Sequence, residues 1–224
     1  MKRPPLVAEF VGTFALTFFS ILVIKNLAHD DAGLIGVAMA SGLTFACLHS
    51  ATAATSGGHL NPAISFGLFV ARQINARTML VYWIVQLLGA TTAAFVAQTV
   101  QLKPNPSTFI EAGTPALDKL TSLPQGILAE TIGTFFLMFV FMGTVIDKRA
   151  PKVGGLFIGL AVSMGVFAIG PITGAALSPA RWFGPAIITG NLSNTVLYTV
   201  GPLLGAGLAG VLYPSLLEEK LEEA

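Results

Sequence analysis

The chain has 224 residues, of which 54% are hydrophobic and 10% charged, and its net charge is +1. Soluble domains carry about a quarter charged residues, so this composition excludes an ordinary soluble domain, and the near-neutral charge gives no general attraction for nucleic acid. The single cysteine, Cys47, excludes an internal disulfide.

Apolar runs long enough to cross a bilayer follow one another along the chain. A helical crossing needs about 20 residues. The sequence predicts six such spans, at residues 6–24, 32–53, 78–100, 126–146, 153–170 and 195–217. Glu9 lies within the first span and Glu130 within the fourth. The chain is therefore predicted to be an all-α, multi-pass membrane protein.

Two further apolar segments, residues 62–72 and 179–189, are too short to cross. As helices they would be roughly 16 Å long, about half of a ~30 Å hydrocarbon core. Each follows a capping residue, Asn61 or Ser178, and begins with proline, which is a strong signal for a helix start. Small residues precede each cap, and non-helical backbone at membrane depth survives only inside protein or beside a wet cavity. The two segments are predicted to be re-entrant half-helices.

The two halves of the chain repeat one another. Residues 8–19 match residues 129–140 at seven of twelve positions, and residues 57–63 align with residues 174–180; the offsets are 121 and 117. We therefore expect one channel domain, residues 1–224, made of repeats at about 6–101 and 126–217. Each repeat has three spans, an odd number, so the second must be inverted relative to the first.

The placement of basic residues predicts the orientation. With both termini inside, eight lysines and arginines lie on the inner side and three on the outer side. The inner residues are Lys2, Arg3, Arg72, Arg77, Lys148, Arg149, Lys152 and Lys220, and the outer ones are Lys25, Lys103 and Lys119. Because cytoplasmic loops are enriched in lysine and arginine, both termini are predicted to be cytoplasmic.

In this arrangement the amino termini of the two half-helices meet near the middle of the membrane. Their partial positive charges would repel cations there. Neutral molecules would instead hydrogen-bond to the caps and to carbonyl groups of Gly57, Gly58, His59, Gly174 and Ala176. Glu9 and Glu130 are expected to accept hydrogen bonds from the re-entrant loops. The sequence shows no catalytic pair, metal cluster or nucleotide loop, so we expect no enzyme activity and no cofactor.

The paired motifs resemble those of the aquaporin and glycerol-facilitator family, also called the major intrinsic proteins. The resemblance covers nearly the whole chain and rests on residues 56–63, on residues 178–186 and on the twin Ala-Glu-x-x-Gly-Thr-Phe segments. It implies an hourglass fold, one pore per subunit and a homotetramer. It places the pore centre at Asn61, Pro62, Ala63, Ser178, Pro179 and Ala180. The family usually has asparagine where this chain has Ser178, which is an equally good cap with a shorter side chain.

The resemblance also implies a selectivity filter near the outer mouth, formed by Ser41, Val166, Ala175 and Arg181. Water-selective relatives usually have an aromatic residue at the first position and histidine at the second. Serine and valine are smaller, which favours a wider filter. Trp182 is unusual for the family, and it could fold across the opening and narrow it.

We therefore expect a passive channel in the lipid bilayer, in the cell membrane, for water and small uncharged solutes such as hydrogen peroxide, urea, glycerol or neutral metalloid acids. Ions and protons would be excluded. Two alternatives are a strictly water-selective channel and a secondary transporter, which also uses inverted repeats and broken helices.

Overall fold

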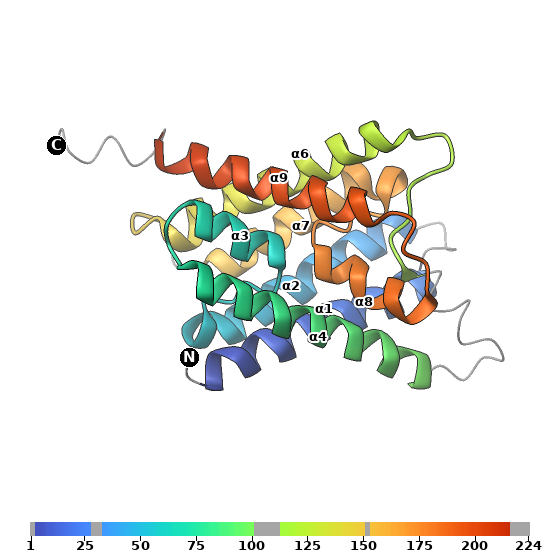
Figure 1. Ribbon diagram of the computed structural model, residues 1–224, viewed down its shortest axis with the longest axis horizontal. Helices are drawn as coiled ribbons and strands as arrows, with labels where there is room; N and C mark the ends of the chain where they lie inside the picture. The colour runs from blue at the N-terminus through green and yellow to red at the C-terminus, as the bar shows by residue number, and fades with distance from the viewer. Residues whose placement is uncertain (1–2, 28–32, 101–112, 151–152, 216–224) are drawn as a thin grey trace.

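The computed structural model describes residues 3–27, 33–100, 113–150 and 153–215. The described residues form helices and no strands (Figure 1). Six helices are long and apolar enough to cross a membrane, if the π-helical turn η1 (Met142–Ile146) that continues α6 is included. They are α1 (Arg3–Leu27), α2 (Gly33–Ser56), α4 (Ala76–Val100), α6 (Leu123–Phe141), α7 (Gly154–Thr173) and α9 (Thr195–Tyr213).

These helices confirm the predicted all-α fold, with ends that differ from the predicted ones by a few residues. The first residue of the predicted second span and the last two of the predicted sixth lie outside the described residues, as do Lys2, Lys103, Lys152 and Lys220. Large apolar side chains such as Ile35, Leu88 and Val211 are exposed on the outer faces of the helices. Such an outer surface suits contact with lipid rather than water.

The two predicted half-helices are α3 (Pro62–Val70) and α8 (Pro179–Thr189). Each begins with proline after a cap in extended conformation, because proline fits the first helical position and the cap side chain accepts a free backbone N–H. Figure 1 shows α3 and α8 at opposite ends of the bundle, with α1 and α6 running in opposite directions. This is the arrangement that an inverted repeat produces.

Small residues let the long helices approach closely. A methyl group added to Gly42 in α2 would lie 2.4 Å from the carbonyl oxygen of Gly159 in α7. One added to Gly205 in α9 would lie 2.1 Å from the carbonyl oxygen of Thr131 in α6. Only glycine fits at such distances, so these seams hold α2 against α7 and α6 against α9. The half-helices pack against this bundle, α3 mainly against α9 and α4, and α8 mainly against α4.

Candidate functional site: the cavity beside the half-helices

The segments that lead into the half-helices have an unusual backbone. Leu60, Ala175 and Leu177 have φ angles of 53°, 46° and 52°, in the left-handed region that residues with a Cβ rarely adopt. Such conformations persist only where the surrounding structure imposes them, and they occur at functional sites. The two loops therefore need anchors elsewhere in the fold.

Glu9 of α1 is the anchor of the first loop. Its carboxylate is fully buried and accepts hydrogen bonds from the backbone N–H groups of His59 (2.9 Å) and Leu60 (2.6 Å). The hydroxyl of Ser56 (2.6 Å) and the side-chain amide of Gln86 (2.8 Å) donate to the same carboxylate. Four donors thus satisfy one buried acid, which in turn satisfies two backbone groups that lipid could not.

Glu130 of α6 holds the second loop in the same way. It is fully buried and accepts from the N–H groups of Ala176 (2.9 Å) and Leu177 (2.8 Å) and from the hydroxyl of Thr173 (2.6 Å). Tyr198 of α9 donates its hydroxyl to the carbonyl of Thr173 at 2.6 Å. Both acids therefore fix the carbonyl groups of their loops in one orientation.

The tips of the two half-helices meet through Asn61. Its side-chain oxygen accepts from the N–H of Ala63 at 2.8 Å, and its amide nitrogen donates to the carbonyl of Leu177 in the other loop, also at 2.8 Å. Ser178 caps α8 by a longer contact of 3.4 Å with the N–H of Arg181. Among the described residues, Ser178 makes no hydrogen bond to the first loop. The junction is therefore asymmetric, because serine is too short to reach across as asparagine does.

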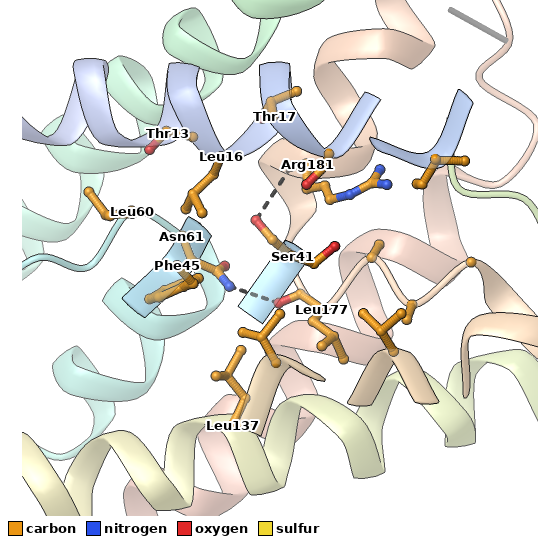
Figure 2. A pocket seen from close by; sticks show the side chains of 18 of the residues that line it. Thr13, Leu16, Thr17, Ser41, Phe45, Leu60, Asn61, Leu137, Leu177 and Arg181 are labelled. Atoms are coloured by element: carbon orange, nitrogen blue, oxygen red, sulfur yellow. Dashed lines mark hydrogen bonds between the residues drawn. The ribbon is translucent and has the colours of Figure 1, made fainter. Parts of the chain in front are cut away.

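A cavity of about 60 Å³ begins at this junction and reaches Arg181. This volume is several times the roughly 10–15 Å³ that a single water molecule needs. The half-helix loops contribute Leu60, Asn61, Gly174, Ala175, Ala176, Leu177 and Ser178 to its lining. The long helices contribute mainly apolar side chains, and Figure 2 shows Leu16 and Leu137 on opposite sides of it. A mostly apolar wall with a few fixed polar groups suits the passage of small neutral molecules.

All four predicted filter residues line this cavity. Ser41 comes from α2, Val166 from α7, Ala175 from the second loop and Arg181 from α8. The guanidinium of Arg181 donates to the carbonyl of Gly113 at 3.4 Å. Figure 2 shows Arg181 and Ser41 in the same region of the cavity. The fold thus brings together residues that lie up to 140 positions apart in the sequence.

Other predicted site residues lie outside this cavity. Pro62, Ala63, Pro179 and Ala180 form the first turns of the half-helices but do not line it. Gly57, Gly58 and His59 are also outside its lining. The carbonyl of Gly58 is bonded to the Nδ1 of His49 at 2.9 Å, and the Nδ1 of His59 contacts the hydroxyl of Ser65 at 3.0 Å.

Trp182 does not close the cavity. It is 2% exposed, and its ring stacks on that of Tyr198 with centroids 5.6 Å apart. Together with Ala176, Ala186 and Leu197 it forms a small apolar cluster behind α8. Its bulk therefore does not narrow the filter, contrary to the possibility that the sequence raised.

A second cavity, of about 740 Å³, opens beside the loop between α6 and α7. His49, Thr144, Asp147 and Lys148 are among its polar lining residues. The ring of Phe141 makes edge contacts with the rings of His49 and His59, with centroids 5.4 Å and 6.3 Å away, and Phe141 is fully buried. It lines neither cavity.

The sequence reasoning missed several lining residues of the long helices. Thr13, Thr17 and Ser20 of α1 line the first cavity, as do Phe45 and Val162. The three hydroxyl residues are spaced four and three positions apart. That spacing places them on one helix face and was a readable signal in an otherwise apolar span.

Fold and site together define a passive transmembrane channel. The sequence model of the family described as Major intrinsic protein matches residues 3–213. Two of the relatives are Aquaporin TIP2-3 of Zea mays and Aquaporin TIP2-1 of Arabidopsis thaliana, each 36% identical over 92% of this chain. The match covers 85% of the length of the first relative and 84% of the length of the second. The aquaglyceroporin structure from Plasmodium falciparum shares the fold, with a TM-score of 0.83, 23% identity and 99% of each chain covered.

The chain belongs to the major intrinsic protein family. It is an integral, multi-pass membrane protein and a passive channel for water and small solutes, not an enzyme. The resemblance noted in the sequence is thereby confirmed. The alternative of a secondary transporter loses its support, because the buried acids Glu9 and Glu130 are bonded to the loops and line no part of the cavity between Asn61 and Arg181.

Proposed function

We propose that this channel conducts water together with small uncharged solutes, namely hydrogen peroxide, urea, glycerol or neutral metalloid acids. The observation that carries the proposal is the set of three small side chains, Ser41, Val166 and Ala175, that share one cavity with Arg181. None of them fills the space of the aromatic residue and histidine expected in a water-selective filter. Trp182, the one bulky candidate for closing it, packs behind α8.

The exclusion of ions and protons is proposed to rest on two groups. The amino termini of α3 and α8 meet at the inner end of the cavity, where their partial charges oppose a cation. Arg181 adds a full positive charge at the other end. A cation in the cavity would also lose its hydration shell without gaining an acidic partner, because the described residues of the lining include no aspartate or glutamate.

A strictly water-selective channel is the second candidate, and the small cavity favours it. A volume of about 60 Å³ fits water more easily than glycerol. Stopped-flow light scattering on proteoliposomes separates the two candidates. We expect the wild type to pass water and at least one of the named solutes. Rapid water flow with no measurable solute flow would refute the broader proposal.

A filter variant makes this test sharper. Ser41→Phe with Val166→His inserts the aromatic and histidine pair into the cavity, and it should abolish solute flow while water flow persists. Val162→Ala, also in the lining but outside the predicted filter, is the matched control and should leave both flows in place. If the double variant passes solutes as well as the wild type does, the residues Ser41 and Val166 do not form the filter.

The assembly and its placement are also proposals. We propose a homotetramer with one pore per subunit, with both termini on the cytoplasmic side of the cell membrane. The bias of basic residues supports the orientation, but an intracellular membrane with a cytoplasmic face would satisfy it equally. Native mass spectrometry should give four subunits, and fractionation of the source cells should place the protein with the cell membrane. A monomer, or recovery from another membrane, would contradict the respective proposal.

A further inference from the structure

One face of α1 carries hydroxyl groups to which the family resemblance assigns no role. Thr13, Thr17 and Ser20 all line the cavity and are 2%, 1% and 7% exposed. Among the described residues, the hydroxyl oxygens of Thr13 and Thr17 have no hydrogen-bond partner. The hydroxyl of Ser20 makes no hydrogen bond within the described part of the chain either. Unlike the two threonine oxygens, it is not sealed off by neighbouring atoms.

Unbonded buried hydroxyls are rare because each one loses its hydrogen bonds to water on folding. In a packed helix seam they would be replaced by apolar groups of the same shape at little cost. Here they form a row beside the space through which the solute passes. The hydroxyl of Ser20 is therefore open to a hydrogen bond with a molecule in the cavity.

Among the polar groups that line the cavity, the backbone carbonyl groups and Arg181 each offer only one kind of hydrogen bond, and the hydroxyl of Ser178 already accepts one from the N–H of Arg181. The carbonyl groups of Gly174 and Ala176 only accept hydrogen bonds, and the guanidinium of Arg181 only donates them. A serine hydroxyl does both. Figure 2 shows α1, with Thr13 and Thr17, on one side of the cavity and Leu177 of the second loop on the other. Ser20 lies on the same face of α1 as these two threonines, so the hydroxyl that is not sealed off lies on the α1 side of the cavity.

A water molecule is small enough to bond to one side alone. A solute that carries polar groups at both of its ends, such as urea or glycerol, leaves one end unbonded unless both sides offer partners. Ser41 of α2 also lines the cavity, and its hydroxyl is likewise unbonded among the described residues. Its position beside Arg181 (Figure 2) places a second free hydroxyl near the outer end.

We propose that Ser20 of α1 is a solute-binding residue of the channel: it bonds the second polar end of small neutral solutes that carry two or more hydroxyl or amino groups, while the opposite loop and Arg181 bond the first. The proposal rests on the broader solute range given above. It makes Ser20 a determinant of which solutes pass, separate from the four filter residues.

Ser20→Ala tests the proposal, because it removes one oxygen and cannot narrow the cavity. If only size decided, solute flow would stay the same or increase. We expect urea and glycerol permeabilities to fall about fivefold, the rate equivalent of one net hydrogen bond. Water permeability should stay within about twofold. The control is Thr134→Val in α6, which also removes a buried hydroxyl without a hydrogen-bond partner among the described residues, but one that lies outside the cavity lining.

A second measurement keeps the proposal testable if solutes bind without passing. With equal glycerol on both sides of the vesicle membrane and a sucrose gradient driving water, glycerol bound at Ser20 should slow water flow in the wild type, and less so in Ser20→Ala. Absence of solute flow in the wild type refutes the broad solute range. Absence of any Ser20 dependence, in both solute flow and the slowing of water, overturns the role of Ser20.

Discussion

Replacing Glu9 by glutamine tests how the first re-entrant loop is held. The carboxylate uses one oxygen for Ser56 and the N–H of His59, and the other for Gln86 and the N–H of Leu60. Glutamine offers one oxygen and one NH₂ group. Whichever way it turns, the NH₂ group faces a backbone N–H, so either His59 or Leu60 loses its acceptor.

The side-chain partners can adapt, and this limits the loss. The hydroxyl of Ser56 can rotate to accept, and Gln86 can turn its amide, whose oxygen is unbonded in the structure. The neutral amide also avoids the cost of burying a charge, which offsets the weaker hydrogen bonds that it accepts. One unsatisfied buried N–H therefore remains, at about 1–3 kcal/mol. For a chain of this size that corresponds to roughly 2–12 °C in unfolding temperature.

Thermal unfolding in detergent, followed by intrinsic fluorescence, would measure this loss, and proteoliposome water flow would report on the loop. Glu130→Gln is the matched variant, since the same reasoning leaves either Ala176 or Leu177 without an acceptor. The two variants should lose similar stability. If Glu9→Gln unfolds at the wild-type temperature and conducts water normally, the carboxylate is not required as a double acceptor and the anchoring argument is wrong.

Three further predictions concern the helix seams, the apolar cluster and an inner loop. Gly205→Ala should destabilise the fold by more than the roughly 1–3 kcal/mol typical of overpacking. Gly190 has a φ of +72° and nothing within 4 Å, so Gly190→Ala should cost only about 1 kcal/mol of backbone strain. Thermal unfolding of both variants would show the difference, and equal losses of stability would contradict it. Trp182→Ala should lower stability by about 3–5 kcal/mol but leave water flow per folded channel unchanged, because Trp182 does not line the cavity. Altered solute selectivity in this variant would show that Trp182 does act on the pore. Hydrogen bonds from Arg149 hold the pKa of Asp147 well below its usual range, so the stability that they add is present above the ordinary aspartate pKa of about 4 and is lost as the pH falls below it. The unfolding temperature should therefore fall less steeply from pH 6 to pH 3 in Asp147→Asn than in the wild type. Identical slopes would show that the contact contributes nothing.

The sequence predicted most of the scaffold because local signals and membrane physics agree there. A cap followed by proline marked the start of both half-helices, and Glu9 and Glu130 stood out as acids in apolar spans. The side chains around them were less predictable. The glutamine that helps to hold Glu9, Gln86, is 77 positions away, and no local pattern indicates this contact. The direction of Trp182 depends on its stacking with Tyr198, which only the packed fold reveals.

The repeat also separates what the fold needs from what selectivity needs. The loop anchors recur in both halves: Glu9 and Glu130 hold backbone N–H groups in the same way. The lining recurs only in part: the repeat-related pairs Leu16 and Leu137, and Asn61 and Ser178, line the cavity from both halves. Thr13 lines it, whereas its repeat partner Thr134 does not. Ser20 has no repeat partner in the lining, because the equivalent position is Phe141. We therefore expect a substitution at Ser20 to change solute flow without disturbing the scaffold, whose anchors Glu9 and Glu130 lie outside the lining.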